Sequence, residues 1–437
     1  MNRTKTIFAV LALVAASPAV PLLARPVPQA AALDARPVVE AVRKAIAANY
    51  VLPARRPALD AALAKGLADG RYAVTDPGEL ARRITDDLFA VAHDKHLGLN
   101  FDPRQSAALA GASGRDDAEN NPVFDEFART HNHGVSELKV LDGNVRYLRY
   151  DGFLWTGAQS EAAIDSAMAF LRGGDAIIID LRTNGGGSPD AVRRIASYFV
   201  PAGVKLVTFH LRSDPPTVST TDKDVPGGRI AGVPVYVLAS GRSASAAEEF
   251  LSHAKLQKFG TLVGETSAGA GYRNELIGIP QGFVLSVSIG RPELPDGSDW
   301  EAKGVAPDIA ASAPDALARA QIAALDTLAA KAQGPRRAEL GWLADAQRAR
   351  VAPAPLARPL AAYAGRYGPR TISVEDGKLV YRRDGGVTTA LLPLGPDRFV
   401  MEADSGTQIR FTLTGGAVTG FELLNADGPP RVQAKDG

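Results

Sequence analysis

Apolar runs that alternate with amphipathic helical stretches occupy the middle of this 437-residue chain. The apolar runs cover residues 175–180, 233–239 and 261–264, and the helical stretches cover residues 159–171, 189–199 and 245–256. Short runs that are apolar at every position are typical of strands buried on both faces. The sequence therefore predicts an α/β fold, a mostly parallel sheet covered by helices.

The flanking segments have other patterns. Apolar residues recur at helical spacing before His96, Asp76-Pro77 is typical of a helix start, and the polar stretch 104–121 predicts a surface loop. Short alternating runs with turn pairs predict a small antiparallel β domain at the C-terminus. We therefore predict a signal peptide and leader (1–30), an N-terminal helical domain (34–98), an α/β core (99–330), a helix with a Pro-rich linker (331–360) and a C-terminal β domain (361–437).

The N-terminus has the order of a secretory signal peptide. Arg3 and Lys5 precede an apolar run, residues 7–16, and small residues follow it. An uncleaved membrane anchor is the alternative, but Pro18 and Pro21 interrupt a stretch that is barely long enough to span a bilayer. We expect cleavage and a periplasmic or secreted protein that keeps no stable membrane span.

Composition excludes several kinds of chemistry. The chain has no cysteine, which excludes a cysteine nucleophile, an iron–sulfur cluster and a thiolate zinc site. Its formal net charge of +1 gives no electrostatic reason to expect a nucleic-acid partner.

Ser245 follows an apolar strand and a short turn and stands where a helix begins. The first N–H groups of a helix have no intrahelical partner, so the amide of Ala246 is available to an oxyanion that forms beside Ser245. The same residues, Ser245 to Glu248, also match a capping box, which many helices carry for stability alone.

A glycine-rich segment, Asp180-Leu-Arg-Thr-Asn-Gly-Gly-Gly187, follows another buried strand. Glycines at the carboxyl end of a strand let backbone N–H groups approach a ligand closely, and this edge is where α/β sheets bind ligands. A flexible turn is the alternative.

A serine nucleophile needs a base, and the histidines offer candidates. His96 closes the helical N-terminal region, and spacing alone leaves both a base and a surface histidine open. A metal site is another alternative, built from His93, His96, His131 and His133. Glu301 lies in a turn before Pro307-Asp308, where a carboxylate can orient a histidine.

The order of these motifs resembles the tail-specific (C-terminal processing) serine peptidases. The matching segments are Asp94-Lys-His96, Asp180 to Gly187, Ser245-Ala-Ala-Glu248, Gly264-Glu-Thr266 and Glu301 to Asp308. The resemblance is greatest to the branch of interphotoreceptor retinoid-binding protein and the tricorn core protease. It implies a crotonase-like or ClpP-like ββα core.

The resemblance also implies roles for individual residues. The processing peptidases use a lysine as base, but Ala270 stands at that position here. The tricorn-like branch pairs its serine with a histidine and a glutamate, which match His96 and Glu301. Oxyanion donors are then the amides of Ala246 and of Gly186 or Gly187, with Glu248 in support. Lys95 stands where the tricorn pattern has a serine, which leaves the fourth member of the relay open.

The sequence thus predicts a serine peptidase that needs no cofactor or metal and acts on peptides or unfolded proteins. Trimming of carboxyl ends and internal cleavage both stay open. One alternative is a non-catalytic binding protein for hydrophobic ligands or peptides on the same fold, and the other is the metal-dependent hydrolase.

Overall fold

The computed structural model describes residues 33–111, 122–212, 215–426 and 428–436. Its central layer is a six-stranded sheet with the strand order β11-β8-β7-β4-β3-β2. All neighbouring strands are parallel except β2, which is antiparallel to β3. The strands are β2 (Val135–Leu141), β3 (Val145–Tyr150), β4 (Ala176–Asp180), β7 (Val235–Ala239), β8 (Thr261–Gly264) and β11 (Ile309–Ala310).

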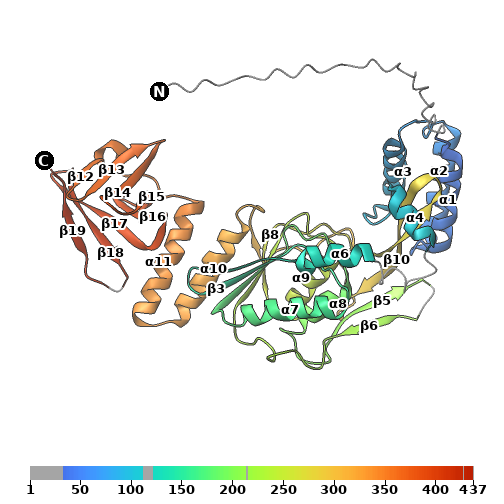
Figure 1. The fold of residues 1–437 in the computed structure, drawn as a ribbon, viewed down its shortest axis with the longest axis horizontal. Coiled ribbons are helices and arrows are strands. Elements are labelled where there is room, and N and C mark those ends of the chain that lie inside the picture. Colours follow the sequence, from blue (N-terminus) through green and yellow to red (C-terminus); the bar gives the residue numbers. More distant parts are fainter. Residues whose placement is uncertain (1–32, 112–121, 213–214, 427, 437) are drawn as a thin grey trace, which may run out of the picture.

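Helices cover both faces of this sheet (Figure 1). One face packs against α7 (Ala158–Leu171), α8 (Pro189–Ala196) and α9 (Ala246–Leu256). The other packs against α10 (Ala316–Lys331) and α11 (Gly334–Val351). Alternate residues of one strand serve the two faces, since Ile177 and Ile179 of β4 face the first layer and Ile178 faces the second. The predicted mostly parallel sheet with helical cover is therefore confirmed.

A second sheet joins the N-terminal helices to the core. It is formed by β1 (Gly98–Phe101), β5 (Lys205–Leu211), β6 (Thr217–Thr220), β9 (Arg273–Ile279) and β10 (Phe283–Glu293). Strand β1 pairs with β10, although about 190 residues separate their sequences. The N-terminal helices α1 (Ala35–Asn49), α2 (Arg56–Ala68) and α3 (Pro77–Ala92) share one apolar core with β1, β9 and β10 of this sheet.

The segment after β1 differs from the prediction. The stretch 104–121 was expected to be a loop, but Pro103–Gly111 forms helix α4, and a further helix, α6, covers Pro122–Thr130. Asp102 starts α4, because its carboxylate accepts the Gln105 amide at 2.9 Å and Pro103 occupies the first turn. Residues 112–121 lie outside the described part of the chain.

The C-terminal part is an eight-stranded antiparallel sheet in simple sequence order, as predicted for this segment. Its strands are β12 (Gly365–Tyr367), β13 (Arg370–Glu375), β14 (Lys378–Arg383), β15 (Thr388–Gly395), β16 (Arg398–Met401), β17 (Asp404–Thr414), β18 (Ala417–Asn425) and β19 (Arg431–Ala434). The amide of Asp436, just after β19, donates to the carbonyl of Arg366 in β12 at 2.8 Å, so the two edges of the sheet meet. Buried aromatic residues such as Tyr367 and Phe421 fill the interior.

The predicted signal peptide and leader, residues 1–30, lie outside the described residues. Within the part of the chain that is described, no helix combines the length and the apolar character needed to cross a membrane. The domain boundaries given above stay a prediction.

Candidate active site

Three loops meet at the carboxyl edge of the parallel sheet. They follow β4, β7 and β8, which lie side by side in the same direction, so that the loops 181–187, 240–245 and 265–272 emerge together. The predicted nucleophile and oxyanion donors, Ser245, Ala246, Gly186 and Gly187, lie in these loops and at the start of α9, whereas His96 and Glu301 come from other segments.

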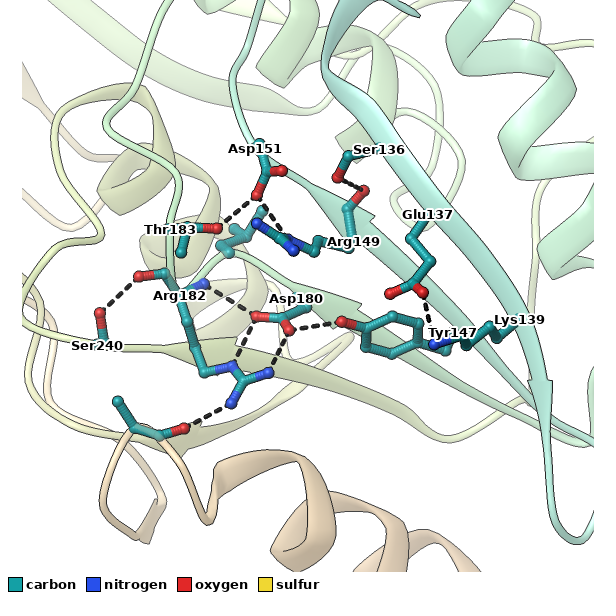
Figure 2. A network of polar contacts seen from close by, with 12 residues as sticks. Ser136, Glu137, Lys139, Tyr147, Arg149, Asp151, Asp180, Arg182, Thr183 and Ser240 are labelled. Carbon is teal, nitrogen blue, oxygen red and sulfur yellow. Dashed lines mark hydrogen bonds and ion pairs between the residues drawn. The ribbon is translucent and has the colours of Figure 1, made fainter. Parts of the chain in front are cut away.

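The loop after β4 is held rigidly by its first residues. Asp180 is buried and accepts hydrogen bonds from the Tyr147 hydroxyl at 2.7 Å and from the Arg182 guanidinium at 2.6 Å. Arg182 also donates to the carbonyl of Ala313 at 2.6 Å, which ties the loop to the segment before α10. Figure 2 shows this network, with Thr183 and Asp151 beside it. The Asp-Leu-Arg motif thus fixes the end of β4 through these hydrogen bonds.

Asn184 connects this loop to the turn that carries Ser245. Its side chain is fully buried, donates to the Tyr150 carbonyl at 2.8 Å and accepts the Gly186 amide at 2.9 Å. Its own carbonyl accepts the Ala244 amide at 3.1 Å. The two loops therefore have a fixed relative position.

Ser245 has a backbone conformation that few non-glycine residues adopt, with φ 56° and ψ −120°. A helix N-cap ordinarily has extended backbone angles, so this residue is not an ordinary cap. A sharp strand-to-helix turn of this kind is how α/β hydrolases expose their nucleophilic serine. Ser245 lines a cavity of about 490 Å³ together with Ala246 and Gly187.

Two backbone N–H groups beside Ser245 are free of acceptors within the described residues, those of Ala246 and Gly187. The amide of Gly186 is engaged, because it donates to Asn184. Gly186 instead allows close approach: a Cβ atom on it would lie 2.8 Å from Ser245 Cβ and 3.2 Å from the Ala246 nitrogen. Of the two glycines suggested by the sequence, Gly187 is the one whose N–H is available.

Glu248 is completely buried, and its carboxylate connects two loops through hydrogen bonds. Its carboxylate accepts the Ser245 amide at 2.9 Å, the Ser267 hydroxyl at 2.6 Å, and the amides of Gly269 and Ala270 at 2.5 and 2.8 Å. A capping box explains only the first of these bonds. The other three fix the loop after β8 against the turn that carries Ser245.

Glu301 acts on the same loop. Its carboxylate accepts the amides of Gly271 at 2.5 Å and Tyr272 at 3.1 Å. Burial raises the pKa of Glu301 to about 7, with the charges of Asp94 and Glu248 contributing to the rise and the amides of Gly271 and Tyr272 opposing it.

His96 lies between α3 and β1 and is half-buried. Its backbone amide donates to the Asp94 carboxylate at 2.8 Å, and its carbonyl accepts the Ser286 hydroxyl at 2.5 Å. Burial lowers the pKa of His96, while the carboxylates of Asp94 and Glu248 oppose this change. No hydrogen bond joins Ser245 to His96 among the described residues, and His96 lines a different cavity, together with Lys95 and Ser286. The Lys95 ammonium donates to the carbonyl of Ala268.

The four histidines of the alternative metal site have other partners. His131 Nδ1 contacts the Phe127 carbonyl at 2.8 Å, His133 Nδ1 contacts the Ser160 hydroxyl at 2.8 Å, and His93 packs against the Phe89 ring. Over the described ranges, no group of three or more histidine or acidic side chains is placed to hold a metal ion.

The sequence reasoning missed two acidic residues near the site. Asp94 is buried, and its charge acts on both His96 and Glu301. It belongs to the Asp94-Lys-His96 motif, but no role was assigned to it. Glu249 lines the cavity of Ser245. Two adjacent glutamates at a helix start give no signal in the sequence of which one faces a cavity.

Two family models match the chain. The model of peptidase family S41 matches residues 144–311, and that of the N-terminal domain of S41 peptidases in eukaryotic IRBP matches residues 32–127. All three loops of the site lie within the first match.

Curated relatives agree with this match. The chain is 27% identical to the chloroplastic carboxyl-terminal-processing peptidase 2 of Arabidopsis thaliana, over 43% of this chain and 35% of that protein. It is 26% identical to the carboxy-terminal processing protease CtpA of Bacillus subtilis, over 41% and 37% of the two chains. The chain thus spans little more than a third of the length of these relatives.

Solved structures with a similar arrangement include the photosystem II D1 C-terminal processing protease and the tricorn protease. The first has a TM-score of 0.40 and 18% identity, over 63% of this chain and 92% of that one. The second has a TM-score of 0.39 and 11% identity, over 64% and 35%. Because the two matched segments together span more than half of the 437 residues, the chain belongs to peptidase family S41.

Proposed function

We propose that this protein is a serine peptidase that cleaves peptides or unfolded proteins with Ser245 as its nucleophile. The observation that carries the proposal is the position of Ser245 on a strained turn, at a cavity, beside the unused N–H groups of Ala246 and Gly187. Such a pair of fixed donors stabilises the oxyanion of a tetrahedral intermediate. The family membership supports the same reaction.

In the proposed mechanism, Ser245 Oγ attacks the peptide carbonyl and His96 accepts its proton. The carbonyl oxygen becomes an oxyanion held by Ala246 and Gly187. His96 then returns the proton to the leaving amine, and water hydrolyses the acyl-enzyme by the same steps. His96 must come within hydrogen-bond reach of Ser245 when substrate is bound, since catalytic contacts often tighten only in that complex.

Glu301 and Glu248 support this chemistry as positioning residues. Together they accept five backbone amides, one at Ser245 and four in the loop 265–272. Lys95 holds the same loop from the side of His96. We further propose export from the cytoplasm, on the signal-like order of residues 1–30.

Hydrolysis of an unfolded protein such as reduced casein tests the proposal. Wild-type protein is expected to release peptides with or without a chelator, and Ser245→Ala is expected to lose at least about 10⁴-fold in kcat. Ser298→Ala, at an exposed serine, is the matched control. Hydrolysis that the chelator abolishes favours the metal-dependent alternative, and no hydrolysis by the wild type favours the binding protein.

A further inference from the structure

The cavity beside Ser245 has two charged side chains in its wall, Glu249 and Arg273. Aromatic rings form much of the remaining wall, and Trp155 and Trp300 are among them. Arg273 belongs to β9, where its guanidinium lies 5.9 Å from the centre of the Phe209 ring. Glu249 belongs to α9, the helix that begins directly after the nucleophile.

Glu249 stands one helical turn after Ser245. The Glu249 amide donates to the Ser245 carbonyl at 3.0 Å, and both residues line the same cavity. A carboxylate at this position is within reach of the side chain of the substrate residue whose backbone carbonyl Ser245 attacks. Glu249 is only 2% exposed, so what remains accessible faces the cavity that it lines.

The surroundings of Glu249 differ sharply from those of its neighbour Glu248. Glu248 accepts hydrogen bonds from four donors, whereas the side chain of Glu249 contacts His253 Nε2 at 3.3 Å. His253 is fully buried, and its Nδ1 has no hydrogen-bond partner among the described residues. A buried carboxylate that has one hydrogen-bond partner gains more from pairing with a cation than a carboxylate that already accepts four hydrogen bonds.

We propose that this cavity is the specificity pocket of the peptidase and selects a cationic side chain, lysine or arginine, at the residue whose carbonyl is attacked. Glu249 pairs with the ammonium or guanidinium group, and Trp155 and Trp300 contact the aliphatic stem and the charge. This assignment rests on the proposed function of Ser245.

Two covalent probes that differ in one charge test the assignment. They are peptidyl diphenyl phosphonates with lysine or norleucine next to the phosphorus, since these side chains match in length apart from the ammonium group. The ratio of their labelling rates on Ser245 is measured for wild type, Glu249→Gln and Glu275→Gln. Glu275 is an exposed glutamate on β9 outside the cavity wall, and its substitution changes the net charge equally.

The wild type is expected to prefer the lysine probe by at least about tenfold, as a desolvated charge-assisted contact provides. The ratio should fall toward one in Glu249→Gln and stay at the wild-type value in Glu275→Gln. Thermal unfolding midpoints establish that each variant is folded. Because the wild-type ratio needs no variant, it tests the assignment even if Glu249→Gln does not fold.

Equal labelling of the wild type by both probes, or an unchanged ratio in folded Glu249→Gln, would overturn the specificity assignment and leave the peptidase proposal intact. A wild type that neither probe labels would contradict the peptidase proposal itself, and with it this assignment.

Discussion

At the residue scale, the sequence around Glu248 predicts a helix cap, whereas the structure shows that its carboxylate mainly holds a neighbouring loop. Next to Ser245 it resembles a helix cap, yet three of its four hydrogen bonds go to the loop 265–272. Its substitution therefore affects a loop about twenty residues away in sequence. No local pattern predicts this, because the partners come from another strand end.

Glu248→Gln tests this role. A glutamine keeps the size of the side chain but turns an N–H group toward backbone donors, so about 2–3 kcal/mol of unfolding free energy should be lost. Activity should fall as well, because the loop and the nucleophile turn separate. Urea unfolding measures the first effect and casein hydrolysis the second. Wild-type stability in the variant would contradict the role of Glu248 in holding the loop 265–272 against the turn that carries Ser245.

The role of His96 as base predicts how activity depends on pH. A general base must be neutral, and burial lowers the pKa of His96 from its ordinary value of about 6.5. Protonation of His96 is therefore expected to reduce activity as the pH decreases, with a midpoint below 6.5. The pH profile of kcat/KM between pH 4.5 and 8 measures this midpoint. A rate that is flat from pH 5 to 8 would contradict a histidine base.

At the scale of elements, the glycine loop after β4 positions the site by close approach. Gly186 has φ +112°, and a Cβ atom there would meet Ser245 Cβ at 2.8 Å. Gly185, its neighbour, has no atom within 4 Å of such a Cβ. The two glycines are therefore a matched pair for experiment.

Gly186→Ala should reduce kcat by about a hundredfold, the effect of a displacement near 1 Å in a catalytic site. Gly185→Ala should keep wild-type activity. Casein hydrolysis by the two folded variants measures the difference. Equal losses in both would contradict the close packing of Gly186 on the nucleophile turn.

Sequence patterns predicted the elements that support the site. The apolar runs at 175–180 and 261–264 are β4 and β8, and the helix predicted from Ser245 is α9. Sequence patterns did not predict α4, because this polar, alanine-rich helix is stabilised by contacts with other elements. Its Ser106 is buried and donates to the Ile279 carbonyl of β9. The relative position of Ser245 and His96 depends on the pairing of β1 with β10, which neither strand's own sequence encodes.

At the scale of the whole molecule, the site lies far from the C-terminal sheet (Figure 1). The residues that line the cavity of Ser245 fall between Phe124 and Trp300. The C-terminal sheet contacts the rest through α11, whose Ala346 and Ala349 pack against Val400. The sheet is thus connected to the core without contributing to the cavity.

Two truncations distinguish the contribution of the C-terminal sheet from that of α11. A chain that ends at Ala352 keeps α11 and should react with a serine-directed probe as the full chain does. A chain that ends at Ala332 loses Leu340 and Leu343 from the core and should have a lower thermal midpoint. Loss of labelling in a folded chain that ends at Ala352 would show that the C-terminal sheet acts on the site.

The most direct test of the central claim is labelling with a fluorophosphonate, followed by proteolysis and mass spectrometry to locate the adduct. The account predicts one adduct, on Ser245, that is absent in Ser245→Ala and present in Ser298→Ala. An adduct on another serine, or none in folded wild-type protein, would contradict Ser245 as the nucleophile.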